Sequence, residues 1–273
     1  MDLISHQRLF TRGTLLSALV ALTAESGAHG QEQDPTLEAM QQRTAEVKAD
    51  FADQEDSSSA LQRNDVPLLR FSDPAREGFD GTLWLWSSNS RPVALLSLTR
   101  YSEFWNYEHI SLTERPLEFS GQEGWKWSSQ AKPREWIQLD DPVAETSKQR
   151  IIQMRSVSRQ FRAIEHYEGQ QHNLRMFSRP VYLYSDSRTS ILDGGLFVFS
   201  HDTNPEIVMS VESRRTDSGE TAWCVAFSRT AAADLTVHHG EREVWNAPQV
   251  LRWDPREEDY GHTVPIPEFD TGE

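Results

Sequence analysis

Cysteine, basic residues and long apolar runs are all scarce in this chain of 273 residues. Cys224 is the only cysteine, which excludes an internal disulfide and a site built from paired cysteines. Lysine and arginine total 27 against 42 acidic residues, for a formal net charge of −15. This charge argues against binding a nucleic acid. After the first thirty residues no stretch approaches the ~20 apolar residues of a membrane span, so we expect no integral membrane segment in the mature chain.

Familiar catalytic signatures are also missing. The sequence has no G-x-S-x-G, H-E-x-x-H, C-x-x-C or G-x-G-x-x-G motif and no Walker loop. Hydrophobic residues make up 37% and charged residues 25%, a composition typical of a folded protein. We therefore expect a folded domain with no cofactor and no recognised catalytic motif.

The first thirty residues have the pattern of an export signal. Arg8 and Arg12 precede the apolar run LLSALVALTA, and small residues follow it up to Ala28 and Gly30. The run is shorter than a membrane anchor needs. We predict that residues 1–30 are a signal peptide and that the mature protein is periplasmic or secreted.

One phrase of the sequence occurs twice. PLLRFSDPAREGFDGTLW begins at Pro67, and PVYLYSDSRTSILDGGLF begins at Pro180, so the two copies align without a gap at an offset of 113 residues. TLWLW in the first copy and LFVFS in the second are apolar at successive positions. This pattern predicts strands that are covered on both faces, and hence a core shared by the two halves.

Aspartates and glycines recur at matching positions of the two copies. We expect Gly81 and Gly194 to end a loop with a positive φ, which glycine adopts at little cost, and Asp73 and Asp186 to cap turns. These aspartates are too few for a known calcium loop, so we predict no calcium site.

Helical and strand patterns alternate along the chain in a repeated order. Apolar residues recur at spacings of three and four within 37–51 and again within 151–164. Short strand patterns with short connections follow each. We therefore predict an α+β fold with an internal duplication, in which each half is one helix followed by an antiparallel meander of about five strands. The predicted repeats span 31–140 and 141–253, and an acidic flexible tail covers 254–273.

The best candidate for a catalytic site is the segment SHDTNPE. Features common to both copies are scaffold, so function is expected where the copies differ, and His201 has serine as its counterpart. We take His201, Asp202 and Glu206 as candidate catalytic residues acting as acid and base, with His238 or His239 as further partners. Their spacing matches no recognised ligand set, so we predict no metal site. The alternative is a solvent-facing hairpin loop.

Aromatic and basic residues form a second candidate site. Trp125, Arg134 and Trp136 lie in GWKWSSQAKPREWIQL, a composition that suits an anionic glycan or an acidic peptide. Trp105 and Tyr107 share one face of the predicted strand WNYEHIS and are placed to stack on a sugar or peptide ring. These five are the candidate ligand-binding residues. The alternative in both places is aromatic packing within the core.

The segments RPVALLSL, EHISLTERPL, QRIIQMRSVSRQF and DGGLFVFSHDTNPEIVMSVES resemble an uncharacterised family of exported proteins from planctomycete-type bacteria. The resemblance covers most of the chain after the presequence. It implies export and offers no functional residues. In such relatives the corresponding loop looks like GTDPE, whereas this chain has HDTNPE, which weakens a shared catalytic role for His201.

Together these observations predict an exported, non-catalytic binding or structural module whose partner is a glycan, a peptide or a protein. The alternative is a hydrolase or isomerase with its site at the interface of the two halves, using His201 with Asp202 or Glu206. A pocket that holds His201 near a carboxylate would favour the enzyme, and a flat aromatic surface at Trp125 and Trp136 would favour binding.

Overall fold

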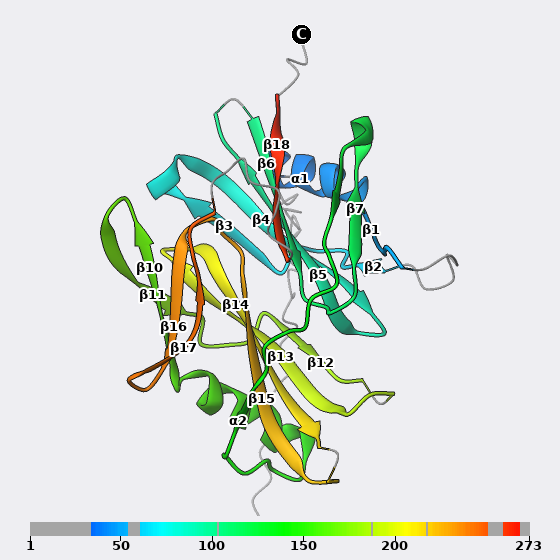
Figure 1. Cartoon of the computed structure of the whole chain (residues 1–273). Coiled ribbons are helices and arrows are strands. Elements are labelled where there is room, and N and C mark those ends of the chain that lie inside the picture. Colours follow the sequence, from blue (N-terminus) through cyan, green and yellow to red (C-terminus); the bar gives the residue numbers. More distant parts are fainter. Residues whose placement is uncertain are drawn as a thin grey trace, which may run out of the picture. The chain divides into compact units, whose positions relative to one another are not determined.

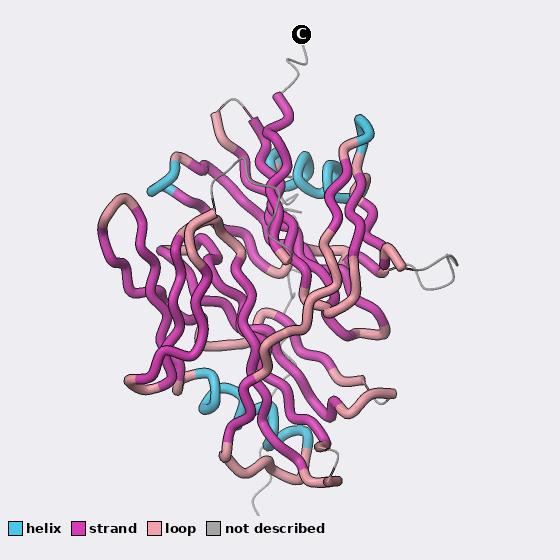
Figure 2. Tube along the Cα trace, viewed as in Figure 1, coloured by secondary structure: helices cyan, strands magenta, loops and turns pink. Residues whose placement is uncertain are grey.

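The computed structural model describes residues 34–53, 61–102, 104–186, 188–216, 218–250 and 259–267. All of them except Asp34 belong to one unit, Pro35–Glu273. Strand accounts for 54% of the structure and helix for 13% (Figure 2). The predicted α+β class with two helix-plus-meander repeats is therefore wrong. The protein is mostly β, with large antiparallel sheets and a half-barrel.

The first large sheet has six strands in the order β18-β6-β5-β4-β2, with β3 paired to β4 (Figure 1). Its edge strand β18 comes from the far end of the chain. The strands are β2 (Gln62–Arg63), β3 (Leu69–Asp73), β4 (Gly78–Ser88), β5 (Arg91–Arg100), β6 (Phe104–Ser111) and β18 (Tyr260–Pro267).

The second sheet has nine strands in the order β17-β16-β10-β11-β13-β14-β15-β9, with β12 paired to β13. Its edge strand β9 precedes the second predicted repeat in the sequence, so neither large sheet follows the predicted boundaries. The strands are β9 (Ile137–Leu139), β10 (Phe161–Tyr167), β11 (Gln170–Met176), β12 (Tyr182–Tyr184), β13 (Ile191–His201), β14 (Asn204–Arg215), β15 (Thr221–Arg229), β16 (Asp234–His239) and β17 (Arg242–Ala247).

Smaller elements complete the described structure. A three-stranded sheet has the order β1-β7-β8, and two short 3-10 helices, η2 and η3, connect strands. No helix among the described residues is long and apolar enough to cross a membrane. The elements are α1 (Pro35–Ala45), β1 (Lys48–Phe51), η2 (Pro74–Arg76), β7 (Leu117–Ser120), η3 (Gln122–Gly124), β8 (Lys126–Ser128) and α2 (Ser147–Ser158).

Helix α2 begins and ends earlier than the helical pattern of 151–164 suggests. Its N-cap is Thr146, whose side chain accepts a hydrogen bond from the backbone N–H of Gln149 at 3.4 Å. The helix ends at Ser158, and Phe161 begins strand β10. Apolar residues spaced by three and four thus continue from the helix into a strand, which is why the helical share was overestimated.

The apolar runs of β4 and β13 are covered on both faces, as predicted. Leu83 of β4 and Leu196 of β13 belong to one cluster that contains side chains of both large sheets. The alternate residues Trp84 and Phe197 face two separate clusters. Trp84 packs in a cluster that contains Met40 of α1, and Phe197 packs in another that contains side chains of α2. Each fully buried large side chain stabilises the fold by about 1.5–3 kcal/mol, so the shared cluster holds the two sheets together.

Part of the predicted flexible tail is a strand. Residues 260–267 form β18, and Tyr260 lies opposite Ile110 of β6. Tyr260 is buried, and its hydroxyl donates a hydrogen bond to Oε1 of Glu108 at 2.5 Å. The rest of the predicted tail, except for Asp259, and the predicted signal peptide lie outside the described residues.

Gly81 and Gly194 do not have the positive φ that the sequence suggested. Both lie within strands, where a Cβ atom would stand 2.3 Å from the ring of Phe71 and 2.4 Å from the ring of Tyr184, respectively. An aromatic ring from the neighbouring strand packs directly on each glycine backbone. The glycines are therefore needed for close approach of a ring.

Candidate functional site

Charged side chains cluster where the connection between β3 and β4 meets the second sheet. Arg76, the last residue of η2, donates from Nη1 to Oε1 of Glu206 at 3.0 Å and from Nη2 to Oε1 of Glu165. Both glutamate side chains are 0% exposed, and Arg76 is 13% exposed. One guanidinium thus holds two buried carboxylates from different strands.

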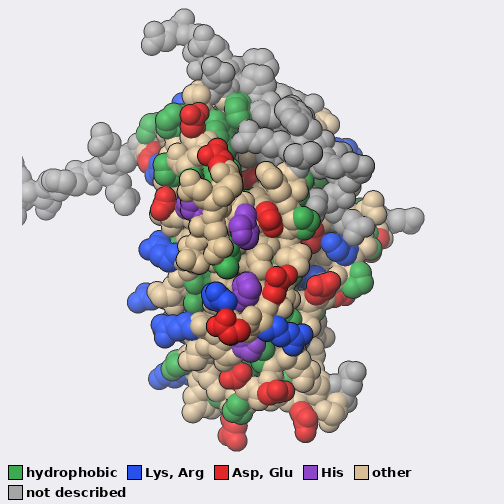
Figure 3. Space-filling model, turned by 60° about the vertical axis from the view of Figure 1, so that its left-hand side comes forward, with side chains coloured by type: hydrophobic (Ala, Val, Ile, Leu, Met, Phe, Trp, Pro, Cys, Tyr) green, Lys and Arg blue, Asp and Glu red, His purple; other side chains and the backbone are tan. Residues whose placement is uncertain are grey.

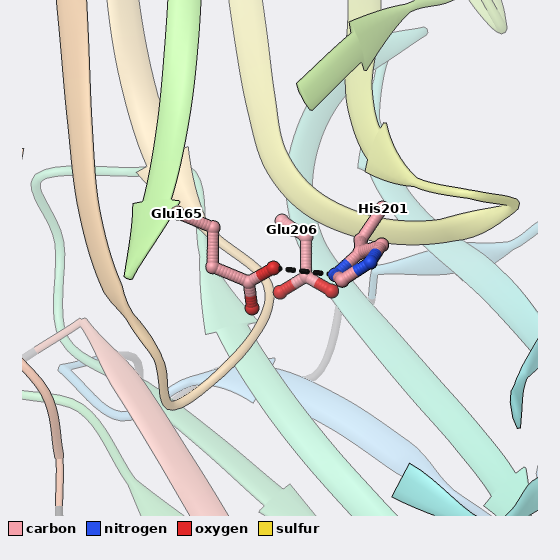
Figure 4. Close-up of side chains that lie close together, drawn as sticks. All are labelled: Glu165, His201 and Glu206. Carbon is pink, nitrogen blue, oxygen red and sulfur yellow. Dashed lines mark hydrogen bonds and ion pairs between the residues drawn. The ribbon is translucent and has the colours of Figure 1, made fainter. Parts of the chain in front are cut away.

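The order of strands in the second sheet brings the cluster together. Glu165 lies on β10, His201 at the end of β13 and Glu206 on β14. In the sheet β13 and β14 are adjacent, and β11 lies between β10 and β13. Side chains that point to the same face of neighbouring strands lie next to one another. Figure 4 shows the three side chains converging.

His201 is paired with Glu165. Its Nδ1 lies 2.7 Å from Oε2 of Glu165, and its side chain is 17% exposed. The ring of His172 lies 4.5 Å from that of His201, and no described residue hydrogen-bonds the other ring nitrogen. A carboxylate that holds one imidazole nitrogen orients the ring and leaves the second nitrogen for acid or base chemistry. Figure 3 shows histidine, acidic and basic side chains gathered on one face.

Asp73 and Asn204 extend the network. Asn204 donates from Nδ2 to Oε1 of Glu206 at 2.8 Å and to Oδ2 of Asp73 at 3.2 Å. The same Asp73 oxygen accepts from Arg76 at 3.1 Å. The predicted turn-capping role is therefore wrong for Asp73, although Asp186 does accept a turn hydrogen bond from the following backbone.

The network carries three carboxylates and one guanidinium. Burial raises the pKa of Glu206 to about 8, while Arg76 lowers it and the neighbouring carboxylates Glu165 and Asp73 raise it. Burial lowers the pKa of Arg76, but the three carboxylates together raise it above its usual range, so Arg76 stays charged. The second oxygen of Glu206, Oε2, is buried without a hydrogen-bond partner.

Two of the three predicted catalytic residues meet in the structure. His201 and Glu206 belong to one cluster whose ligand atoms lie within 4.8 Å of one another. Asp202 does not join them, because it is exposed in the hairpin turn, with a φ of 50°. Its backbone carbonyl accepts hydrogen bonds from Arg175 and Ser200. The carboxylate partner of His201 comes from β10 instead.

The further histidines proposed from sequence lie elsewhere. His239 sits opposite Phe161 in the pairing of β16 with β10, and His238 is its neighbour. Four residues of β10 separate Phe161 from Glu165, or about 13 Å along a strand. His239 also hydrogen-bonds Gln160 through Nε2 at 2.8 Å, so neither histidine joins the cluster.

Glu165 was missed by sequence reasoning, although its strand carries a signal. In FRAIEHY, Phe161, Ala163 and Glu165 occupy alternate buried positions, although Ile164 between the last two is buried as well. Alternation of period two places the glutamate on the same side as the two apolar residues. A carboxylate in phase with buried positions is uncommon and marks a candidate site.

Three of the predicted ligand-binding aromatics pack inside the protein. Trp105 is 2% and Tyr107 is 3% exposed, and both belong to the core of the first sheet. The ring of Trp125 lies 5.6 Å from that of Tyr107 and packs against this core. The alternative interpretation as core packing describes these residues better than a ligand platform does.

Trp136 and Arg134 lie together at a different place. The guanidinium of Arg134 is 5.0 Å from the Trp136 ring, and that of Arg214 is 3.6 Å from it. Two guanidinium groups of the protein itself therefore lie against this indole. The five predicted residues do not form one flat aromatic surface.

Arg134 lines a pocket of about 170 Å³ near the ends of β6, β15 and β17, which we call the Arg134 pocket. Its guanidinium donates to neutral oxygens, namely the carbonyl of Leu112 at 3.1 Å and the hydroxyls of Ser210 at 3.3 Å and Ser228 at 3.2 Å. No carboxylate of the described residues forms an ion pair with it. Burial lowers the pKa of Arg134, and the more distant Glu212 raises it.

No protein-family model matches the chain, and no curated protein or solved structure is detectably similar to it. Two structural features of the described residues bear on function. One is the buried network around Arg76, and the other is the Arg134 pocket.

Proposed function

We propose that this protein is an exported, non-catalytic binding module that holds an anionic group of a glycan or a peptide in the Arg134 pocket. The observation that carries the proposal is the guanidinium of the half-buried Arg134, which hydrogen-bonds only to neutral oxygens of the described residues, in a residue that lines the pocket. Export is supported by the pattern of residues 1–30 and by the resemblance to exported planctomycete-type proteins.

The lining of the Arg134 pocket favours an anion. Lys132 and Arg229 line it together with Arg134, against the two acidic residues Glu135 and Asp259. The lining of the pocket thus carries a positive formal charge, although the formal net charge of the whole chain is −15. A positive concave site attracts an anionic group from solution and selects against neutral analogues.

The size of the pocket limits what it can enclose. Its volume of about 170 Å³ is below the ~300–1,000 Å³ typical of sites that bury a whole ligand. It suits one carboxylate or sulfate group of a longer chain whose remainder lies outside. Ser111, Thr113 and Asn246 offer further hydrogen-bonding groups, and Trp245 offers an apolar wall for a ring.

The buried network supports a non-catalytic role. His201, Glu165 and Glu206 do not line the Arg134 pocket or the three other pockets formed by residues 137–141 with 239–244, 79–80 with 100–102, and 175–181. Both glutamates are inaccessible to solvent. Through Arg76 the network connects the two large sheets.

Titration calorimetry with charged and neutral ligands tests the binding proposal. We expect oligogalacturonate, a sulfated glycan or an acidic peptide to bind, and their neutral counterparts not to bind. Arg134→Gln and Lys132→Gln should each weaken binding, whereas Arg188→Gln, at an exposed arginine elsewhere, should not. Equal affinity in Arg134→Gln, Lys132→Gln and Arg188→Gln would refute the assignment of the site.

One observation favours an enzyme as a second candidate. The 2.7 Å contact between Nδ1 of His201 and Oε2 of Glu165 orients an imidazole as in a general base. In this case a hydrolase or isomerase would use His201 as the base and Glu165 as the residue that positions it. Unchanged turnover of every substrate by His201→Ala, in an assay panel that the parent passes, would remove this candidate.

A further inference from the structure

We propose that Glu165, His201 and Glu206 bind one divalent transition-metal ion, such as Zn²⁺ or Mn²⁺. The three residues are supplied by β10, β13 and β14 and converge on one point of the second sheet (Figure 4). The proposal is separate from the Arg134 pocket, so either can fail without the other.

The spacing of the ligand atoms is close to what one ion requires. One ligand atom from each residue lies within 4.8 Å of the other two. Nitrogen and oxygen ligands bind tetrahedral Zn²⁺ at ~2.0–2.2 Å, so two ligand atoms on one ion are about 3.4 Å apart. The widest pair would close by about 1.4 Å through side-chain rotation, and Nδ1 of His201 and Oε2 of Glu165, which are 2.7 Å apart, would separate slightly to admit the ion.

The two carboxylates each have one oxygen left for an ion. Arg76 donates to Oε1 of Glu206 and to Oε1 of Glu165. Oε2 of Glu206 is buried without a hydrogen-bond partner, and Oε2 of Glu165 contacts Nδ1 of His201. An ion bound by both Oε2 atoms and by Nδ1 of His201 would give Oε2 of Glu206 a partner. It would also replace the proton that lies between Oε2 of Glu165 and Nδ1 of His201.

Arg76 and Asn204 would then act as outer partners of the ligands. Both donate to Oε1 of Glu206, at 3.0 and 2.8 Å. Groups that hold metal-binding carboxylates in place are a regular part of metal sites. The presence of the guanidinium is thus compatible with an ion, because the two cations use different oxygens.

The charges of the network favour a dication. Asp73, Glu165 and Glu206 are opposed by Arg76 alone, so two negative charges are unmatched when all carboxyl groups are ionised and His201 is neutral. Either two protons or one divalent ion would neutralise these two negative charges. Because a metal ion binds the deprotonated forms of carboxylate and imidazole, binding should strengthen as pH rises.

The ligand set also indicates which ions fit. Imidazole with two carboxylates suits Zn²⁺, Mn²⁺ and Fe²⁺, whereas Ca²⁺ and Mg²⁺ prefer sites made of oxygen alone. His172, whose ring lies 4.5 Å from that of His201, adds a second imidazole beside the cluster. We therefore expect discrimination against Ca²⁺.

Equilibrium dialysis and thermal unfolding of the chelator-treated full chain test the proposal. We expect Zn²⁺ or Mn²⁺ to bind at one ion per chain and to raise the Tm, more at pH 8.0 than at pH 6.5, and Ca²⁺ to have no effect. Glu206→Gln and His201→Gln should weaken binding more than tenfold. The matched control His239→Gln removes another partly buried, hydrogen-bonded histidine and should bind as the parent does.

Two outcomes would overturn the site. One is no stoichiometric binding of either ion to the parent at either pH. The other is an affinity that is the same in His201→Gln as in His239→Gln. Because Glu206→Gln alters a buried network, its folding is verified separately. The visible absorption of bound Co²⁺ in the parent and in His201→Gln supplies an independent measurement of the second outcome, which an identical spectrum in the two proteins would establish.

Discussion

Nη1 of Arg76 lies 3.0 Å from Oε1 of Glu206, although 130 positions separate the two residues in the sequence. This contact joins the β3–β4 connection of the first sheet to a buried face of the second. The glutamate side chain is 0% exposed, so the guanidinium compensates a charge that solvent cannot reach. Docking of the two sheets is thereby coupled to the electrostatics of the network.

Removing the guanidinium should destabilise the fold strongly. Arg76→Ala leaves two buried carboxylates without their cation, and breaking a buried ion pair from one side costs about 3–5 kcal/mol. Arg70→Ala is the matched control, because Arg70 pairs with Asp80 at the surface, where a pair contributes at most ~1 kcal/mol. Urea unfolding measures both changes, and similar losses in the two variants would contradict the role of Arg76.

Glu206 should make stability depend on pH. Burial raises its pKa from 4.5 to about 8 in the folded protein. Between these values the folded chain holds a proton that the unfolded chain has released, so stability falls as pH rises through this window. Glu206→Gln lacks the titrating carboxyl group. Between pH 5 and pH 8.5 the free energy of unfolding of the parent should therefore fall by more than ~1 kcal/mol relative to that of this variant.

Urea unfolding of the parent and Glu206→Gln at several pH values, with a chelator present, measures the difference between the two proteins. Subtracting the free energy of unfolding of the variant from that of the parent at each pH removes the contributions of the other titrating groups, which the two proteins share. A difference that stays constant from pH 5 to pH 8.5 would show that the pKa of Glu206 is the same in the folded and unfolded chains.

A methyl group at Gly81 should clash with the ring of Phe71. The added Cβ would stand 2.3 Å from this ring, and overpacking of this kind costs about 1–3 kcal/mol. Gly195→Ala is a milder control, because its nearest neighbour is the flexible Met154 Sδ at 3.2 Å. The double variant Gly81→Ala with Phe71→Leu should lose less stability than the sum of the single variants, and strict additivity would argue against the contact.

Cys224 should be inert in the folded protein. It lies buried in β15, and burial raises the pKa of its thiol, with a smaller opposing effect of Arg214. Iodoacetamide reacts with the thiolate, so labelling followed by mass spectrometry should be slow in buffer and fast in denaturant. A native labelling rate equal to that of the denatured chain would show that the thiol is accessible.

Long local patterns in the sequence predicted individual strands well. TLWLW, WNYEHIS and LFVFS fall within β4, β6 and β13. The class of fold was not predicted, because the helical spacing through Ile164 conceals the boundary between α2 and β10. Pairings such as β9 with β15 and β18 with β6 depend on side chains far apart in the chain, about which local periodicity carries no information.

The candidate site was predictable only in part for the same reason. His201 and Glu206 lie on one short segment, and breaking of the sequence repeat singled them out. Glu165 was hidden because its strand was interpreted as the end of a helix. Arg76 reaches the network from a distant connection, and nothing in the residues beside it indicates where its side chain will lie.

The pairing of β18 with β6 also bears on how the protein is made. Strand β6 ends at Ser111 and its partner begins at Tyr260. At ~5–20 residues added per second, roughly 7–30 s of synthesis separate the two. Throughout this interval the outer edge of β6 has no strand beside it, so a nascent chain presents an open β edge that another copy can capture.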